Sequence, residues 1–283
     1  MLKRRLVRIT KSSPCMQRNP PPRLYKYQPL TAQTLSALKV RTVWFSKPSR
    51  LNDPFDCAIP WRMKAVTVDD CQRLLRERMD PQMRAFSMDP RYVDDTGRAT
   101  PRLVSELERA GQRVFSDTAT KMYTERGVTC FSELPTNTLL WSHYGGAHRG
   151  VCLEFDTFSS WFQKLHAVRY RDDIPEFDIV DVLLDDATRI LEVMLTKATC
   201  WSYEQEWRAI HKKADKEYCY GVEALTGVYL GATLTESEKD LVCHILHGTP
   251  TKIFEMRRSS NSFHLEVRSV EYTPYHHPRS DAI

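Results

Sequence analysis

The sequence predicts an α+β fold with a mixed or antiparallel central sheet, flanking helices and a helical insertion. Strand-like and helix-like segments do not alternate strictly, which argues against a doubly wound parallel sheet. The last two strand-like runs, "TKIFEMRR" and "FHLEVRSVEY", lie close enough in the chain to form an antiparallel pair. A charged amphipathic region at about 67–126 predicts the insertion. We therefore expect one domain over 23–275, preceded by a flexible basic arm at 1–22 and followed by a tail at 276–283.

Each further element follows from a local pattern of apolar and turn-forming residues. Alternation and β-branched residues predict strands at 23–27, 42–46, 127–132, 150–156, 167–172, 204–212 and 227–231. Helical spacing and capping residues predict helices at 30–40, from 101 onward, at 177–201 and at 235–248. The helix at 177–201 has the strongest apolar stripe and is expected to be continuous.

Composition and charge describe an ordinary globular protein. Apolar residues make up 41% and charged residues 27% of 283 residues, and the net charge of +5 is too small to indicate nucleic acid by itself. The chain has no apolar run of about 18 residues and no secretory signal, so no membrane partner is expected. Eight cysteines stand singly, without a C-x-x-C pair, which favours reduced thiols and a cytoplasmic location.

Several common catalytic motifs are missing from the sequence. It contains no P-loop, no G-x-G-x-x-G opening a helix, no H-E-x-x-H and no G-x-S-x-G. The usual ATPase, dehydrogenase, zinc protease and α/β-hydrolase functions therefore lose support.

The stretch "WSHYGGAHRG" at 141–150 gathers aromatic and hydrogen-bonding side chains directly before a strand. Its glycines permit close approach of a ligand to the backbone, and its aromatic rings can stack on a flat ring. One interpretation is a ligand-lining segment that uses Trp141, Ser142, His143, Tyr144 and His148. The other is a turn in which the two large aromatic residues only pack in the core.

The run "EQEWRAI" places two carboxylates two residues apart. In a strand, Glu204 and Glu206 would share a face, with Arg208 in line. Like charges repel there unless a cation or a function compensates. The sequence leaves open a solvated pair bridged to Arg208 and a carboxylate pair in a cleft.

The loop "SKPSRLNDPFD" at 46–56 combines a strong turn signal with an aromatic residue and acidic groups. Asn52 and Asp53 before proline form the turn signal, and Phe55 and Asp56 follow at once. The loop is either turn chemistry alone or the wall of a ligand pocket.

Together, these stretches occur in a familiar order: "LYKY", "FSKPSRLNDPFD", "CFSELPTNTLLWSHYGGAHRGVCLEFD" and "YEQEWRAI". This order resembles a widespread bacterial family of domains of unknown function, the one numbered 2971. The resemblance covers roughly 24–231. It implies domain boundaries but no activity.

The order also resembles the ADP-ribosyltransferase superfamily, which has a basic residue on a first strand, a serine on a central strand and a late E-x-E. The resemblance implies that Glu206 holds the nicotinamide-ribose 2′-hydroxyl and stabilises an oxocarbenium-like transition state, with Glu204 on the acceptor side. Repulsion between the two carboxylates further predicts that Glu206→Gln leaves folding nearly unchanged.

The remaining roles in this resemblance have alternatives. The basic residue is Arg23 or Lys26, and the serine is Ser132 or Ser46. An S-T-S triplet, which the superfamily carries, is absent. The expected catalytic residues are Glu206, Glu204 and His143, and the expected ligand-binding residues are Tyr25, Lys26, Tyr27, Ser46, Asn52, Asp53, Phe55, Ser132, Trp141, Ser142, Tyr144, His148 and Arg208.

The function that these residues predict is an NAD-utilising ADP-ribosyltransferase-like enzyme or an NAD glycohydrolase. NAD would be its substrate, a protein or nucleic acid its acceptor, and no metal is expected. By analogy, a bacterial toxin or phage-defence effector would fit. Two alternatives stay open: a non-catalytic nucleotide sensor, and a metal-dependent nuclease or nucleic-acid-binding protein with Asp53, Asp56, Glu204 and Glu206 as Mg²⁺ ligands.

Overall fold

The computed structural model describes residues 18–57, 62–77, 81–162, 164–184 and 191–274. The expected flexibility of the N-terminal arm falls mostly outside this range, as does the tail at 276–283. The described end of the arm contacts the sheet domain, because Pro21 and Pro22 accept hydrogen bonds from the side chain and backbone of Thr157.

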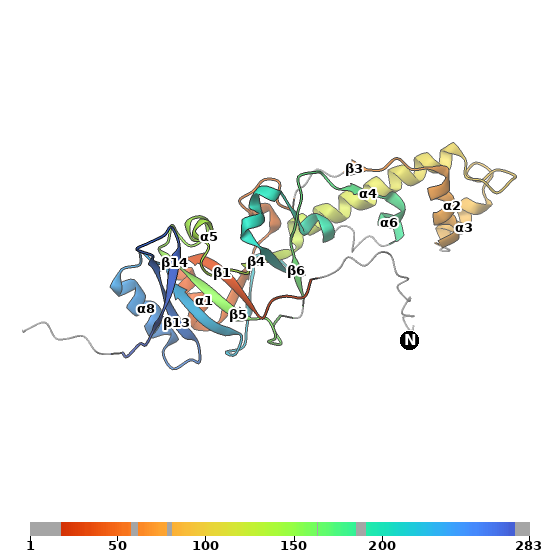
Figure 1. The fold of residues 1–283 in the computed structure, drawn as a ribbon. Coiled ribbons are helices and arrows are strands. Elements are labelled where there is room, and N and C mark those ends of the chain that lie inside the picture. Colours follow the sequence, from red (N-terminus) through yellow and green to blue (C-terminus); the bar gives the residue numbers. More distant parts are fainter. Residues whose placement is uncertain (1–17, 58–61, 78–80, 163, 185–190, 275–283) are drawn as a thin grey trace, which may run out of the picture.

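The fold is α+β, built on an eight-stranded mixed sheet (Figure 1), which confirms the predicted class. The strand order is β14-β13-β12-β5-β1-β4-β10-β6, and all neighbours are antiparallel except β12 and β13. The strands are β1 (Arg23–Pro29), β4 (Gly127–Ser132), β5 (Gly150–Asp156), β6 (Leu165–Ala167), β10 (Glu206–His211), β12 (Leu225–Leu230), β13 (Lys252–Arg258) and β14 (Leu265–Val270).

The sheet divides between β1 and β4. Strand β1 pairs with β5 along its whole length, and β4 pairs with β10 along its whole length. Between β1 and β4, in contrast, only Tyr25 and Ser132 pair in register. The backbone of Ser46 pairs with Val128 of β4 instead, at 2.8 and 3.0 Å. Two half-sheets therefore meet at one residue pair and separate beyond it.

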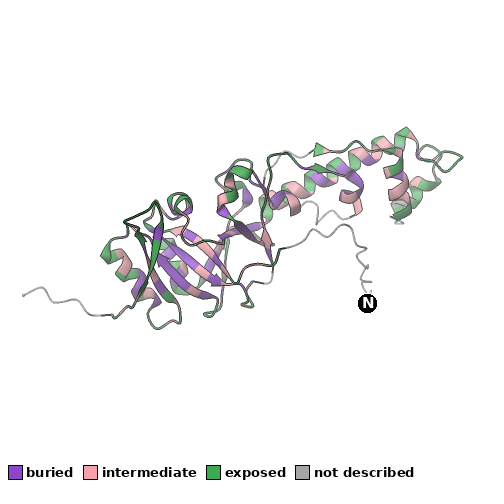
Figure 2. Cartoon of the chain, in the orientation of Figure 1, coloured by how far each residue is buried: buried purple, intermediate pink, exposed green. Residues whose placement is uncertain are grey.

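Helices α1 (Ala32–Val40) and α8 (Glu236–Leu246) form where the capping residues predict them. Thr31 accepts from the Thr34 amide, and Thr235 with Glu238 makes a full capping box. Both helices pack on the core through buried residues such as Leu38 and Val242. Buried residues run along the central strands of the sheet, against which these two helices pack (Figure 2).

A helical arm projects from the sheet domain (Figure 1). It contains α2 (Val68–Glu77), α3 (Pro81–Met88) and the long α4 (Pro101–Glu125), joined by α6 (Ile179–Leu184) from a later part of the chain. Leu74, Leu103, Leu107 and Ile179 form a separate core there. The arm therefore has its own apolar core. The candidate site described below is formed by the sheet domain and not by the arm.

Short elements complete the connections between the large ones. They are β2 (Thr42–Phe45) with β11 (Lys216–Cys219), β3 (Arg62–Met63) with β8 (Glu176–Phe177), β7 (Arg169–Tyr170) with β9 (Thr196–Lys197), the helix α5 (Thr138–His143), and the 3-10 turns η1 (Pro48–Arg50) and η2 (Thr199–Glu204). Among the described helices, none is long and apolar enough to cross a membrane.

The predicted continuous helix at 177–201 is wrong. Helix α6 ends at Leu184, residues 185–190 lie outside the described range, and the chain becomes strand β9 at Thr196. Strand β9 pairs with β7, and both Thr196 and Lys197 are buried. Tertiary pairing and the burial of Lys197 beside carboxylates override the local helical pattern.

The strand predicted at 204–212 begins two residues later in the structure, at Glu206. Glu204 ends the turn η2, and Gln205 adopts a left-handed conformation with φ 44°. The strand β10 begins at Glu206. The two glutamates therefore do not share a strand face by simple alternation.

Candidate functional site

A cavity of about 250 Å³ lies where β1 and β4 separate. Residues of both strands line it, together with the loop after β2, helix α5 and the ends of β9, η2 and β10. The lining residues are Tyr25, Lys26, Tyr27, Gln28, Trp44, Ser46, Leu51, Asn52, Asp56, Val128, Thr129, Cys130, Phe131, Ser132, Leu140, Tyr144, Lys197, Glu204 and Glu206. The opening in the sheet thus creates a concave site with aromatic walls and a charged floor.

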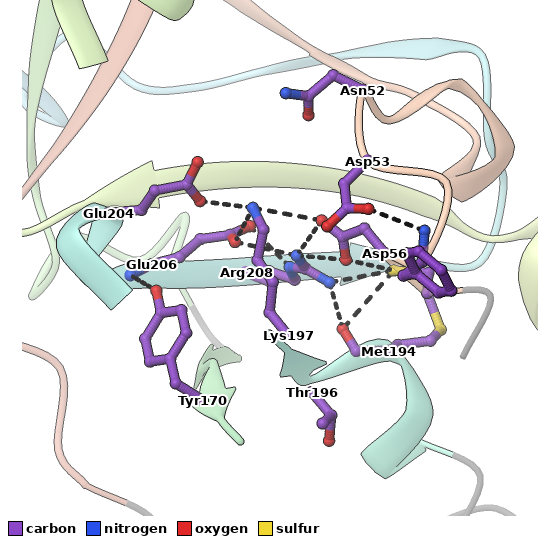
Figure 3. A network of polar contacts seen from close by, with 12 residues as sticks. Asn52, Asp53, Asp56, Tyr170, Met194, Thr196, Lys197, Glu204, Glu206 and Arg208 are labelled. Carbon is purple, nitrogen blue, oxygen red and sulfur yellow. Dashed lines mark hydrogen bonds and ion pairs between the residues drawn. The ribbon is translucent and has the colours of Figure 1, made fainter. Parts of the chain in front are cut away.

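Lys197 lies at the centre of the charged floor (Figure 3). Its Nζ is 2.5 Å from Glu204 Oε2, 3.2 Å from Glu206 Oε2 and 3.4 Å from Asp56 Oδ2. The side chain of Lys197 is only 3% exposed. One buried ammonium therefore holds three carboxylates that come from the loop before β3, from η2 and from β10.

Arg208 forms the second cation of this network (Figure 3). Its Nε donates to Glu206 Oε1 at 2.7 Å, and its Nη2 donates to Glu206 Oε2 at 2.9 Å and to Asp56 Oδ2 at 2.8 Å. Its Nη1 donates to the carbonyl of Met194 at 2.7 Å. The planar guanidinium thus satisfies fixed acceptors on several sides, an arrangement for which arginine is suited.

These contacts determine the charge of Glu206. Burial alone would raise its pKa, but the positive charges of Arg208 and Lys197 outweigh burial and lower the pKa to about 2. Burial likewise opposes the ammonium of Lys197, but Glu206, Asp56 and Glu204 outweigh it and raise the Lys197 pKa. Glu206 is therefore a permanent anion beside a permanent cation.

Glu204 has a different environment from Glu206. Burial is the largest influence and raises its pKa, and the negative charge of Glu206 adds to this, against the opposing effect of Lys197. The Tyr144 hydroxyl donates to Glu204 Oε1 at 2.8 Å, and the Asn52 amide lies 3.1 Å from the same hydroxyl. Glu204 is thus the carboxylate of this pair that takes up a proton more readily.

Local backbone contacts explain how two glutamates from a turn and a strand reach one lysine. Gln205, in a left-handed conformation, joins the end of η2 to the start of β10 between them. The Ser132 hydroxyl donates to the carbonyl of Glu204 at 2.7 Å, and the Glu206 amide donates to the Tyr170 hydroxyl at 2.8 Å. Both glutamates are consequently fixed in place by strands β4 and β7.

Lys26 is a second lysine in the cavity. It is half-buried on β1, and its Nζ donates to the carbonyl of Cys130 at 3.3 Å. Burial lowers its pKa, against weaker opposing effects of Cys130 and Glu206. Its surroundings therefore favour the neutral amine more than those of Lys197 do.

The cavity brings together many of the residues that the sequence singled out. The predicted site residues that line it are Tyr25, Lys26, Tyr27, Ser46, Asn52, Ser132, Tyr144, Glu204 and Glu206. Arg208 lies behind them, fully buried, and reaches the cavity only through its carboxylate partners. The geometry therefore does not support the expected direct contact between Arg208 and a ligand.

Three other predicted residues point elsewhere. Trp141 is fully buried, and its Nε1 donates to the Pro135 carbonyl at 2.8 Å, so it packs in the core. Asp53 accepts from the Phe55 amide at 2.9 Å inside its own turn. Phe55 is 63% exposed on the surface. Core packing explains Trp141 and turn chemistry explains Asp53 without a ligand, and Phe55 does not line the cavity.

The remaining polar residues of the "WSHYGGAHRG" segment lie outside the cavity lining. Ser142 is exposed, and its hydroxyl is 3.2 Å from His148 Nε2. The ring of His148 stacks on Trp141 with an interplanar angle of 14°. His143 is exposed and faces Trp201, with ring centroids 6.2 Å apart. The expected catalytic position of His143 therefore has no support in its placement.

Sequence reasoning missed several lining residues, above all Lys197. Lys197 was overlooked because it lies within the helix expected at 177–201. The signal that could have found it is the run "MLTKATCW", in which it is the only charged residue. Trp44 precedes the loop at 46–56 and Leu51 lies within it, and both line the cavity. Asp56 was expected as part of a pocket wall or as a metal ligand, and the structure places it in the lining and pairs it with Lys197 and Arg208.

The carboxylates do not present a metal-binding set. Within the described ranges, no group of three or more His, Cys, Asp or Glu side chains is arranged to hold a metal ion. The oxygens of Asp56, Glu204 and Glu206 face Lys197 and Arg208. A metal here would have to displace two buried cations.

Comparison with known proteins places the chain beside a protein family but beside no individual protein. No curated protein and no solved structure matches the chain. A family model does match, over residues 140–209, and its description is "Protein of unknown function (DUF2971)". The matched segment contains α5, β5, Lys197, both glutamates and Arg208. Over this segment, the chain matches the model of the DUF2971 family, the family that the order of its motifs resembles.

Proposed function

We propose that the cavity between β1 and β4 binds a nucleoside-containing ligand, with NAD the first candidate, and cleaves its N-glycosidic bond. The observation that carries this proposal is the placement of a lysine on β1, a serine on β4 and a glutamate on β10, three adjacent strands, with a second glutamate at the end of η2. Tyr25 pairs with Ser132, and Ser132 pairs with Glu206, in register. The three parts of the ADP-ribosyltransferase resemblance therefore surround one cavity.

The geometry favours Lys26 over Arg23 as the basic residue. Lys26 lines the cavity, whereas Arg23 forms ion pairs with Glu154 and Asp156 at 3.3 and 3.1 Å. Ser132 and Ser46 both line the cavity, but Ser132 also supports Glu204 through its hydrogen bond to the backbone.

The two glutamates fit different roles in such a reaction. Loss of a nicotinamide or base leaves positive charge on the ribose ring, which a fixed anion stabilises. Glu206, with its pKa held at about 2, is such an anion. Glu204, with its raised pKa, is suited to take a proton from the water or the acceptor that attacks the sugar. Lys197 positions both carboxylates, and Arg208 positions Glu206.

The aromatic walls suit the flat part of such a ligand. Tyr25, Tyr27, Trp44 and Tyr144 all line the cavity. Aromatic side chains stack on nucleobases and pyridine rings, and their hydroxyls can bind ribose oxygens. A nucleoside ligand would therefore find a stacking surface and a charged floor in one cavity.

The nuclease alternative has less support, because its carboxylates are already paired with Lys197 and Arg208 and Asp53 is directed into its own turn. The sensor alternative uses the same cavity without turnover. A measurement of NAD turnover distinguishes the sensor from the enzyme.

The direct test is release of nicotinamide from NAD by the full chain, followed by chromatography, with and without candidate acceptors. We expect Glu204→Gln to lower the rate by on the order of a hundredfold or more. The matched control is Glu255→Gln on β13, since Glu255 also pairs with a lysine and an arginine, Lys239 and Arg257, but does not line this cavity. The control should keep the wild-type rate.

Absence of NAD consumption under all these conditions would rule out the enzyme. If NAD then still raised the melting temperature of the wild type, the sensor would replace it, because a ligand that binds only the native state stabilises it by mass action.

A further inference from the structure

The cavity contains two lysines with opposite surroundings. Lys197 Nζ contacts three carboxylates within 3.4 Å and lies 4.9 Å from the ring centroid of Trp201. Lys26 Nζ has a backbone carbonyl at 3.3 Å and the centroid of the Phe131 ring at 5.6 Å. Among the residues that the structure describes, no carboxylate forms an ion pair with Lys26. The two amines therefore have different chemistry available.

Burial without a carboxylate partner disfavours the ammonium form. Burial is the largest influence on Lys26 and lowers its pKa, while the charge of Glu206 opposes this only from beyond ion-pairing distance. In Lys197 the carboxylates outweigh burial and raise the pKa. A neutral lysine amine is a nucleophile toward carbonyl carbon, whereas an ammonium is not.

Lys26 is also reachable from the cavity. It is half-buried and belongs to the cavity lining, at the point where β1 has left β4. A buried lysine with no cavity beside it could not meet a ligand. The opening in the sheet provides that access.

We propose that Lys26 Nζ is a nucleophilic amine that forms an imine with the open-chain aldehyde of a sugar bound in this cavity. The nitrogen lone pair attacks the aldehyde carbon, and the carbonyl oxygen takes up a proton to give a carbinolamine. The carbinolamine then loses water as the nitrogen gives up its second proton. The products are one imine and one water, and no oxidant or reductant takes part.

Other groups of the cavity fit the rest of a sugar. The hydroxyl of Tyr144 and the carboxylate of Glu204 offer polar partners for sugar hydroxyls, and Trp44 offers an aromatic face for the C–H side of the chain. Glu204, whose pKa is raised chiefly by burial, can hold the proton that the departing hydroxyl needs. This inference does not depend on cleavage of NAD.

The experiment traps the imine by reduction. The full chain is incubated with D-glyceraldehyde, the smallest aldose, and sodium cyanoborohydride, and modified lysines are located by peptide mass spectrometry. We expect Lys26 to be modified roughly tenfold or more ahead of exposed lysines, because a bound aldehyde is held near the amine. Lys39, Lys216 and Lys252 are exposed and serve as internal references.

Two further measurements keep the test decisive. Lys26→Arg keeps a long cationic side chain but cannot form the imine, so the fast modification should disappear while exposed lysines react as before. If that variant fails to fold, the relative modification of Lys26 and the exposed lysines in the wild-type protein still tests the proposal. Equal modification of Lys26 and the exposed lysines, or faster modification of Lys197, would overturn the proposal.

Discussion

Arg208 binds both carboxylate oxygens of Glu206, with Nε 2.7 Å from Oε1 and Nη2 2.9 Å from Oε2. Both side chains are buried, at 0% and 5% exposure. Removing one member of a buried pair leaves the other charge without compensation, which costs more than the pair itself contributes. The charged floor of the cavity is therefore a structural unit as well as a set of candidate reactive groups.

Replacing Arg208 should strongly destabilise the fold. We expect Arg208→Met to lower the free energy of unfolding by about 3–5 kcal/mol, since Glu206 and Asp56 lose a buried cation. Urea denaturation followed by circular dichroism measures this. Arg268→Met is the control, because Arg268 is exposed on β14. A loss below about 1 kcal/mol, the range of exposed ion pairs, would show that the network does not hold the fold together.

Glu206→Gln should also destabilise the protein, against the expectation from the sequence alone. Repulsion from Glu204 is relieved, but Arg208 and Lys197 lose their strongest shared anion. We expect a loss of about 1–3 kcal/mol, the usual cost of leaving buried polar groups poorly paired. Chemical denaturation of Glu206→Gln beside Glu255→Gln tests this. Unchanged stability of Glu206→Gln would mean that repulsion dominates after all.

Acid should weaken the fold through Glu206. Its folded pKa is lowered from 4.5 to about 2, so its contribution to stability is present above pH 4.5 and is lost as the pH falls toward 2. Glu204, with its raised pKa, acts in the opposite sense and offsets part of this. The difference in free energy of unfolding between wild type and Glu206→Gln should shrink between pH 4.5 and pH 2. A difference that stays constant over this range would contradict the assignment.

Tyr144 should tune the protonation of Glu204. Its hydroxyl donates to Glu204 Oε1 and lowers the pKa of that carboxyl. Tyr144→Phe should therefore move the Glu204-dependent limb of the pH profile of kcat/KM to higher pH. Tyr229→Phe is the control, since Tyr229 donates to Glu154, outside the cavity lining. Equal profiles for Tyr144→Phe and wild type would remove Glu204 from the rate-determining proton transfer.

The sequence predicted the fold class and most strands, because each carries a local signal. A short run of apolar residues marks β5, and the Thr235 capping box marks the start of α8. The prediction of a continuous helix at 177–201 failed, because the helical spacing of apolar residues continues into residues that pair as strand β9. A two-residue strand whose lysine is buried against distant carboxylates has no local signature.

The site was partly predictable for the same reason. Glu204, Glu206 and Tyr144 stood out through unusual density of polar groups, and all three line the cavity. Trp141 and His143 stood out equally, yet one is in the core and the other is exposed. The separation of β1 from β4 depends on pairing between distant segments, so the cavity itself could not be seen in the sequence.

The most direct test of the account asks whether the ligand enters the opening between β1 and β4. Trp44 lines this cavity, whereas Trp161 packs against Phe45 and Phe155 and does not. The Glu204→Gln variant is labelled with 5-fluorotryptophan, the two resonances are assigned with single Trp-to-Phe variants, and NAD is titrated while fluorine NMR is recorded. The account predicts a saturable shift of the Trp44 resonance with Trp161 unchanged. Saturable binding that leaves the Trp44 resonance unmoved would contradict it.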